Sequence, residues 1–244
     1  MQHGSDGTIH RKNRLLAVLG PEDFRVLEPH LEPVDLPKGK VVYDIGEPMR
    51  HIYFPHDGIV SLTTILENGG TVEMALFGRE GMFGLISALV TRRSFGRYIT
   101  QISGTASRIT AERLNEAGRE RPKIRELVFR FTEALMVQTL QTVACNAVHS
   151  VEARCCRSIL NTCDRVDYDA LPLTHETLAE MLGVQRSTVS SVTRALQVAG
   201  LIQQGRGAIT ITDRAGLEEM SCECYRKIRT TFERLLPGTY APTS

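Results

Sequence analysis

Three arginines, Arg186, Arg194 and Arg206, lie in a stretch of the chain, residues 181–212, that contains no Asp or Glu. A guanidinium group presents its N–H donors as a planar fork that matches a phosphate group or the edge of a guanine base. A segment without acidic residues also approaches a polyanion without charge repulsion. The residue types in this stretch therefore predict contact with a nucleic acid.

Two short helices that meet at Gly183 are expected to position these arginines. Thr174 can cap the first helix with its hydroxyl group, and Leu178 and Leu182 share one helical face. Gly183 suits the left-handed backbone conformation that ends a helix. We expect the second helix to begin near Ser187.

The second helix has one apolar and one polar face. Val189, Val192 and Leu196 are three and four residues apart, so we expect them to face the core. Hydroxyl groups and backbone amides at a helix N-terminus suit phosphate contacts. The candidate DNA-binding residues are Thr174, Arg186, Ser187, Thr188, Ser190, Ser191, Arg194 and Arg206.

A two-stranded wing is expected directly after the second helix. A Gly at position 200 ends the helix, residues 201–202 begin one strand, and residues 209–212 form the returning strand. The loop between them carries Arg206 between two glycines. Helix pairs of this spacing also occur in all-α cores that bind nothing. The acid-free stretch and the Gly-Arg-Gly loop are the features that favour DNA binding.

Two runs of residues in this region carry a family resemblance. Residues 173–190 follow the pattern L-T-x-E-x-L-A-x-M-L-G-V-x-R-x-[ST]-V-[ST], and residues 195–202 follow A-L-x-x-A-G-L-I. Both resemble the DNA-binding domain of the Crp/Fnr transcription regulators, and a weaker resemblance extends over most of the chain. It implies an α+β fold with three parts. These are a cyclic-nucleotide-binding-like β-barrel or jelly roll (13–120), a dimerisation helix (121–149) and a winged helix-turn-helix domain (150–236).

The resemblance also implies roles for individual residues. Arg186 matches the family arginine at the start of the recognition helix. Ser187 stands where some members carry a base-reading glutamate, and Ser191 stands where some carry a second arginine. The DNA sequence bound should therefore differ from the usual family target. The implied partners are a second copy of the chain, a near-palindromic double-stranded DNA site, RNA polymerase and a small-molecule effector.

The N-terminal half has the pattern of short β-strands. Apolar stretches recur at intervals of roughly 8–12 residues between Gly-rich breaks, which is typical of a β-sandwich or small barrel. The expected strands are 41–43, 51–54, 58–65, 71–77, 97–102 and 105–109. Two short helices, 13–20 and 22–31, are expected before them, and we expect residues 1–12 to form a mobile tail.

A barrel of this kind can also be an enzyme, as in the cupins. That chemistry would require several histidines and a carboxylate on adjacent strands to hold a metal ion. The predicted strands and their loops carry only His51 and His56, without an H-x-H motif. We therefore expect no catalytic residues and no enzymatic activity.

The resemblance places a ligand site in the barrel, near the Gly-rich residues 78–84. Backbone amides at a Gly-rich helix start can hold an anion. However, Met82 stands where nucleotide-binding members carry a ribose-binding acid, and a bulky Tyr-Ile pair follows Arg97 near the phosphate-binding position. The implied ligand residues are Gly81, Met82, Phe83, Gly84, Arg97 and Thr139. The departures favour a different small molecule, or none, over cyclic AMP or cyclic GMP.

A long helix is predicted over residues 122–148, which contain no Gly and no Pro after the first position. About 26 residues give a rod of roughly 39 Å. Its apolar stripe can pack entirely on its own barrel or pair with the same helix of a second copy. We favour the dimer, which would place two recognition helices about one DNA turn, roughly 34 Å, apart. A further helix to residue 163 and a polar linker over 164–170 are expected next.

The overall charge does not point to a nucleic acid. The formal net charge is +1, and residues 165–244 contain nine basic and nine acidic residues. DNA recognition would therefore rest on a local patch. The alternative is a ligand-binding or protein-interaction module that has lost DNA binding. No apolar run reaches the ~20 residues that a membrane helix needs, and the polar N-terminus lacks a signal peptide. We expect a cytoplasmic protein with no membrane partner.

All six cysteines lie in the second half of the chain, at positions 145, 155, 156, 163, 222 and 224. None forms a C-x-x-C motif, and the spacing between Cys222 and Cys224 is shorter than usual for zinc. Iron–sulfur members of the resembling family use cysteines near the N-terminus, which this chain lacks. We therefore expect reduced thiols without a metal site.

Overall fold

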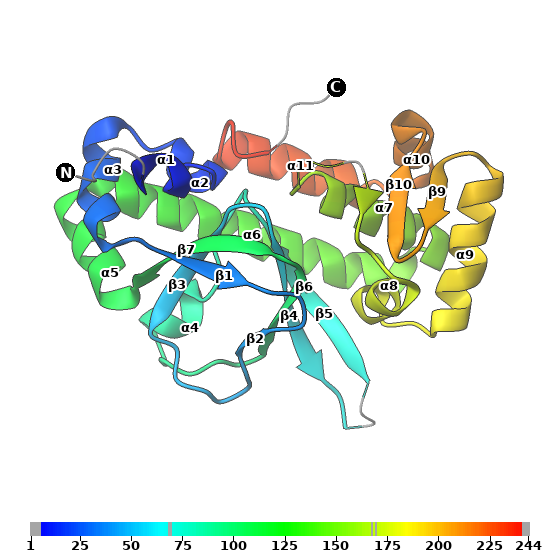
Figure 1. Cartoon of the computed structure of the whole chain (residues 1–244), viewed down its shortest axis with the longest axis horizontal. Helices are drawn as coiled ribbons and strands as arrows, with labels where there is room; N and C mark the ends of the chain where they lie inside the picture. Colours follow the sequence, from blue (N-terminus) through cyan, green and yellow to red (C-terminus); the bar gives the residue numbers. More distant parts are fainter. Residues whose placement is uncertain (1–5, 68–69, 167, 169, 241–244) are drawn as a thin grey trace.

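The computed structural model, which describes residues 6–67, 70–166, 168 and 170–240, has the expected α+β architecture (Figure 1). A β-barrel lies against one long helix, α6 (Pro122–Val148). A small winged-helix unit (residues 170–220) lies near the far end of α6, and the chain then returns along α6 as α11 (Cys224–Leu235). Within the described residues, no helix is long and apolar enough to cross a membrane.

The barrel (residues 32–110) consists of two antiparallel sheets. The first has the strand order β1-β7-β3, namely Glu32–Leu36, Gly104–Thr110 and His51–Pro55. The second has the order β2-β6-β4-β5, namely Val41–Tyr43, Arg97–Ile102, Ile59–Ile65 and Thr71–Phe77. All six predicted strands are confirmed. Strand β1 escaped prediction because Pro33 and the charged residues beside it obscure the alternation of Val34 and Leu36.

Short helices close one end of the barrel. They are α1 (Asp6–His10), α2 (Arg14–Ala17), α3 (Pro21–Leu27) and the 3-10 helix η1 (Glu28–His30). His10 is buried, and its Nδ1 lies 2.6 Å from Ser107 Oγ on β7. The expectation of a mobile tail is wrong for residues 6–12, because a polar side chain is satisfied there by a distant partner. Residues 1–5 lie outside the described part of the chain.

Of the helices between the barrel strands and the winged-helix unit, α6 and α7 (Val151–Cys163) agree with the prediction, whereas α4 (Leu85–Leu89) and α5 (Ala111–Glu120) were not predicted. Pro122 begins α6, where its missing N–H costs no hydrogen bond. Ser150 caps α7 by accepting a hydrogen bond from the amide of Ala153 at 3.3 Å.

The winged-helix unit is a three-stranded sheet with three helices. The strand order is β8-β10-β9, namely Ala170–Leu171, Ala208–Ile211 and Ile202–Gly205. The helices are α8 (His175–Leu182), α9 (Arg186–Val198) and α10 (Arg214–Met220). Although α11 lies in the predicted third part of the chain, Ile228 and Phe232 pack into the barrel core with Phe131.

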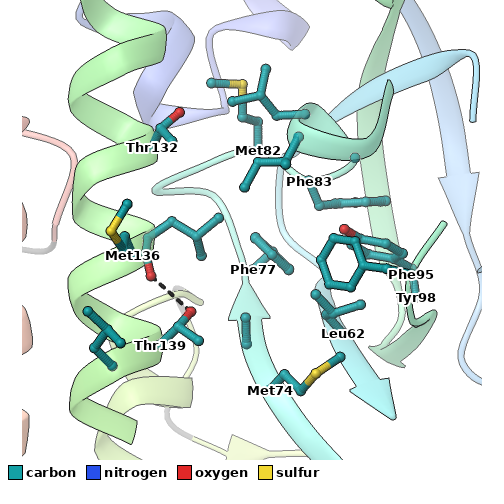
Figure 2. A pocket seen from close by; sticks show the side chains of 16 residues that line it. Leu62, Met74, Phe77, Met82, Phe83, Phe95, Tyr98, Thr132, Met136 and Thr139 are labelled. Atoms are coloured by element: carbon teal, nitrogen blue, oxygen red, sulfur yellow. Dashed lines mark hydrogen bonds between the residues drawn. The ribbon is translucent and has the colours of Figure 1, made fainter. Parts of the chain in front are cut away.

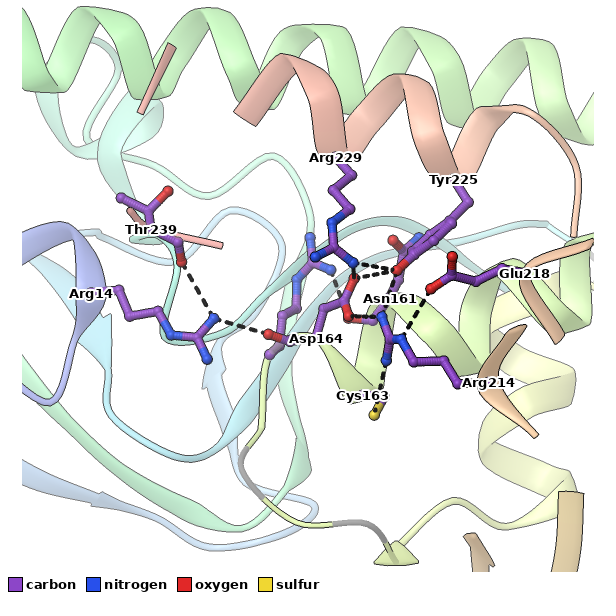
Figure 3. Close-up of polar contacts among 10 residues, drawn as sticks. Arg14, Asn161, Cys163, Asp164, Arg214, Glu218, Tyr225, Arg229 and Thr239 are labelled. Carbon is purple, nitrogen blue, oxygen red and sulfur yellow. Dashed lines mark hydrogen bonds and ion pairs between the residues drawn. The ribbon is translucent and has the colours of Figure 1, made fainter. Parts of the chain in front are cut away.

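The segment predicted as a linker, 164–170, begins as a buried junction (Figure 3). The carboxylate of Asp164 accepts hydrogen bonds from Arg214 Nη2 at 2.6 Å and from the hydroxyl group of Tyr225 at 2.8 Å. Arg165 is also buried. The linker prediction is therefore wrong for residues 164–166, because a polar sequence can be buried when distant helices supply its partners. Positions 167 and 169 lie outside the described residues.

Candidate nucleic-acid interface

The helix pair α8–α9 has the geometry that its local sequence predicts. The hydroxyl group of Thr174 accepts a hydrogen bond from the amide of Thr177 at 3.1 Å and so caps α8. Gly183 ends α8 in the left-handed conformation, with φ 64° and ψ 38°. Helix α9 begins at Arg186, one residue before the predicted start.

The inner face of α9 is fixed by apolar packing. Val189, Val192 and Leu196 are all buried, as expected from their spacing. They share one core with Leu178 of α8 and Ile209 of the wing. This packing determines which face of α9 is presented to solvent.

The outer face of α9 carries exposed polar and cationic groups. Ser187, Ser191 and Arg194 lie at intervals of four and three residues on this face, and Arg186 lies at the helix start. Arg206 is exposed in the turn between the two wing strands. Helix α9 forms an outer edge of the molecule (Figure 1). All three arginines of the acid-free stretch are thus accessible to a partner.

A groove of about 280 Å³ separates the start of α9 from the wing. Thr174 and Arg186 line one part of it, and Gly205 and Gly207 line another. The Gly residues have no side chains to cover the backbone there, and the carboxylate-bearing Glu176 also lines the groove. A groove with a cation, a hydroxyl group and accessible backbone can accommodate a phosphate group.

A polar network centred on His175 joins both helices to the wing. Its Nδ1 lies 2.9 Å from Ser190 Oγ, and its Nε2 lies 2.7 Å from Gln204 Oε1 and 3.1 Å from Thr193 Oγ1. Ser190, a predicted DNA contact, is therefore engaged within the unit, and Thr188 is half-buried. Sequence reasoning missed His175 and Gln204 because their partners are 15 to 29 residues away.

The electrostatics at the start of α9 involve one acid from outside the acid-free stretch. Glu176, in the first turn of α8, forms an ion pair with Arg186. Backbone N–H groups at the helix start, together with Arg186, lower the pKa of Glu176. The carboxylate is thus ionised at neutral pH, and an anionic partner of Arg186 would have to displace it.

A second feature is an apolar cavity between the barrel and α6 (Figure 2). Its volume is about 270 Å³, and none of its lining residues is charged. Helix α6 contributes Thr132, Met136 and Thr139, while the barrel contributes Phe77 and Tyr98 among others. A phosphate or carboxylate placed here would lose its hydration without meeting a cation.

The predicted ligand residues divide into two groups. Met82, Phe83, Gly84 and Thr139 line the cavity. Arg97 and Gly81 are not among the lining residues.

The structure gives Arg97 and Gly81 other surroundings. Arg97 forms two hydrogen bonds, of 3.0 and 2.8 Å, with the carboxylate of Asp44. A Cβ atom at Gly81 would lie 2.4 Å from the ring of Phe131, so this Gly permits close packing against α6. Neither residue is brought to the cavity, because each is held by a partner that local sequence does not reveal.

Two family models match separate parts of the chain. Residues 153–220 match the Crp-like helix-turn-helix domain, and residues 33–120 match the cyclic nucleotide-binding domain. The first covers α7 to α10 and the second covers the barrel. The two matches reproduce the order of parts described above.

Curated proteins and solved structures show the same arrangement. The global nitrogen regulator of Synechocystis sp. is 24% identical over 225 residues, covering 88% of this chain and 98% of that protein. The CRP-like cAMP-activated global transcriptional regulator of Mycobacterium tuberculosis is 25% identical over 202 residues, covering 79% and 89%. The structure of FixK2 from Bradyrhizobium japonicum superposes with a TM-score of 0.70 at 18% identity, covering 79% and 98%.

Proposed function

The chain belongs to the Crp/Fnr family of DNA-binding transcription regulators, and we propose that it acts as a homodimer on a near-palindromic DNA site. The observation that carries this proposal is the outer face of α9. This face exposes Arg186 and Arg194, which belong to the acid-free stretch. The opposite face of α9 is packed in the core, so the orientation of the helix is fixed. A non-enzymatic regulator of this kind works through binding equilibria alone.

In the proposed complex, the first turns of α9 enter the major groove. Arg186 and Arg194 are the candidates for strong contacts with guanine or phosphate, because a guanidinium group can bond either one through two N–H donors. Ser187 and Ser191 face the same groove with weaker hydrogen-bonding groups. Thr174 and Arg206 flank it and contact phosphates, which position the protein without reading sequence.

An apolar stripe on α6 supports the homodimer. Phe129, Met136, Leu140 and Val143 are between 57% and 65% exposed. Phe129, Met136 and Val143 are seven residues apart, which is the repeat of a two-stranded coiled coil. The same stripe on a second copy is a self-complementary partner, since a two-fold axis pairs identical surfaces.

The apolar cavity supports an uncharged effector. Cyclic AMP activation belongs to the mycobacterial relative by its name, but the cavity here has no cation to hold a phosphate. We expect a small, neutral and largely apolar molecule instead. Fluorescence of the neutral dye N-phenyl-1-naphthylamine should rise on binding, and an Ala75→Phe variant, which narrows the cavity, should abolish the rise. Displacement of the dye by cyclic AMP would contradict this assignment.

Selection of binding sites from random DNA duplexes tests the central proposal. Enrichment of a site with two-fold symmetry is the expected result. Arg186→Ala should weaken binding to that site by about 1–3 kcal/mol and reduce its salt dependence. Arg119→Ala, at an exposed position of α5, serves as the matched control. Unchanged binding by a variant with both Arg186→Ala and Arg194→Ala would overturn the residue assignment.

The proposed function also suggests a cellular location and a protein partner. DNA and RNA polymerase are the partners of a transcription regulator, so we propose that the protein works in the cytoplasm and acts on RNA polymerase at promoters. A bacterial two-hybrid assay with polymerase subunits, with and without the selected DNA site, tests this partner.

A further inference from the structure

Four side chains with metal-binding atoms converge at the end of α6. They are Cys145, His149, Cys222 and Cys224, and their ligand atoms all lie within 4.8 Å of one another. The three thiols are almost completely buried. We call these four residues the thiol cluster.

Two separate elements supply the thiol cluster. Cys145 lies in the last turn of α6, and His149, four residues later, is the residue that directly follows the helix. Cys222 lies in the short connection after α10, and Cys224 is the first residue of α11. The two pairs meet because α11 packs along α6.

The distances suit a tetrahedral metal ion. Cys145 Sγ lies 3.4 Å from Cys222 Sγ, and Cys224 Sγ lies 3.5 Å from His149 Nδ1. Zinc bound at ~2.3 Å to sulfur and ~2.0–2.1 Å to nitrogen separates tetrahedral ligands by about 3.5–3.8 Å. Small side-chain rotations are enough to move the four atoms from the observed distances to these.

The surroundings orient the ligands as in a metal site. His149 Nε2 lies 3.1 Å from a carboxylate oxygen of Glu223, and Nδ1 is directed toward Cys224 Sγ, so a neutral ring with its proton on Nε2 would offer Nδ1 to a metal ion. Gln141 Nε2 donates a hydrogen bond to Cys224 Sγ at 3.0 Å, which stabilises a thiolate there. In zinc sites, the ring nitrogen of a ligating His that does not bind the metal commonly donates a hydrogen bond to a carboxylate.

Two positive potentials act on the cluster. The N-terminus of α11, a helix of twelve residues, begins at Cys224 and favours a thiolate. The contact with Cys145 and burial raise the pKa of Cys222, and the positive charge of the buried Arg157 guanidinium opposes that rise. The Nε of Arg157 has no hydrogen-bond partner among the described groups. Three thiolates and one Zn²⁺ carry a net charge of −1, which this buried cation would balance.

We propose that the thiol cluster binds one Zn²⁺ through three cysteine thiolates and His149. Four protein ligands leave no position open, so the ion has a structural role rather than a catalytic one. It ties the end of α6 to the start of α11, next to the point where the chain turns into α7. The expectation of no metal site rested on spacing between neighbouring cysteines, whereas this site joins residues 77 positions apart.

Metal analysis of the purified, reduced full-length protein tests the proposal. We expect about one zinc per chain. X-ray absorption should give three sulfur ligands at ~2.3 Å and one nitrogen ligand at ~2.0–2.1 Å. After Co²⁺ replaces the bound zinc, the absorption spectrum should show the visible bands of a tetrahedral thiolate site. All of these measurements use the wild-type sequence.

Variants then assign the ligands. Cys145→Ser, Cys222→Ser, Cys224→Ser and His149→Ala should each lower zinc affinity by at least tenfold and lower the unfolding temperature. Cys163→Ser and Cys155→Ser, two cysteines outside the cluster, should retain one zinc per chain. Circular dichroism separates loss of the ion from loss of the fold.

Three outcomes would overturn the proposal. The first is a reduced, folded protein that fails to take up added zinc. The second is a disulfide between Cys145 and Cys222 in protein purified with zinc. The third is iron with acid-labile sulfide in place of zinc. All of these measurements are made without DNA. A negative result would therefore contradict the zinc site without bearing on the proposed DNA binding.

Discussion

At the scale of single residues, the contact between Arg186 and Glu176 governs access to the proposed DNA surface. Both side chains are more than half exposed, at 66% and 59%. An ion pair this exposed contributes little to stability, so a phosphate group can replace the carboxylate. Glu176 nevertheless places a negative charge beside the residue best suited to contact DNA.

Glu176→Gln should strengthen DNA binding by about two- to fivefold at low salt, because it removes that charge. Fluorescence anisotropy with the selected duplex at two salt concentrations measures the effect, and the gain should shrink as salt rises. Glu180→Gln, at an exposed position of the same helix, is the control. An equal gain in both variants would mean that only net charge matters and that the ion pair has no special role.

At the scale of elements, α6 is packed on two sides and exposes apolar residues on a third. One side contacts the barrel through buried residues such as Phe131 and Ala134. A second contacts α11, where Gln141 reaches Cys224. The third carries the exposed apolar stripe. An apolar stripe on a long helix is normally covered by another element, which is why a second copy is the expected partner of the stripe.

Val143→Glu should convert the proposed dimer to a monomer, because a coiled-coil interface would bury two unpaired carboxylates beside the two-fold axis. Light scattering after size-exclusion chromatography measures the mass. The selected two-fold DNA site should then be bound more weakly, since each copy holds only half of it. Val41→Glu, on strand β2, is the matched control. A Val143→Glu protein that remains dimeric would exclude this face as the interface.

At the scale of the whole molecule, the barrel and the winged-helix unit share their cores. Ile59, Leu76 and Ile102 of the barrel pack into the apolar cluster of the winged-helix unit. Conversely, Phe232 of α11 packs into the barrel core. Strand β5 also contacts α8, so any displacement of β5 would be transmitted directly to the helix pair.

The junction at Asp164 should be a major source of stability. Its carboxylate accepts from Arg214 and Tyr225, and its carbonyl accepts from Arg14 Nη1 at 3.0 Å, which links α2, α7, α10 and α11 (Figure 3). Asp164→Ala removes the acceptor of a buried ion pair and should cost about 3–5 kcal/mol in the free energy of unfolding. Urea denaturation measures this cost, and Asp35→Ala, at an exposed position of β1, should change little.

Glu73 predicts how stability depends on pH. Glu73 lies on β5, half-buried beside residues of α7, and this loss of hydration raises its pKa to about 7, although Ser61 donates a hydrogen bond to it. The folded state therefore holds this proton more tightly than the unfolded state, whose pKa is near 4.5. The free energy of unfolding should fall as pH rises from about 4.5 to about 7, by up to about 3 kcal/mol.

Urea denaturation at several pH values between 5 and 8 checks this expectation. Glu73→Gln should remove most of the fall and should stabilise the protein at pH 8, because no charge is then buried. Glu67→Gln, at an exposed position just before the turn between β4 and β5, is the control. Identical pH profiles for the wild type and Glu73→Gln would show that Glu73 is not the titrating group.

Most elements, and the outer face of the recognition helix, could be predicted from sequence. Thr174 and Gly183 mark the ends of α8 through hydrogen bonds and backbone preferences that act over three or four residues. The spacing of Val189, Val192 and Leu196 gave the buried side of α9 for the same reason. By contrast, β1 was missed because its proline and the charged residues beside it obscure its apolar alternation. The buried junction after α7 was missed because its polar residues are satisfied by distant partners.

What the sequence determined by itself was local: where helices begin and end, which face of α9 is buried, and where acids are absent. The tertiary structure alone decided which distant residues meet. It placed Cys145 beside Cys222, made the predicted ligand site an apolar cavity, and turned Asp164 into a buried junction. The physical reason is the sequence separation over which each kind of interaction acts. Capping and periodicity act within a few residues, whereas metal ligation, cavity lining and buried ion pairs depend on packing between segments far apart in the chain.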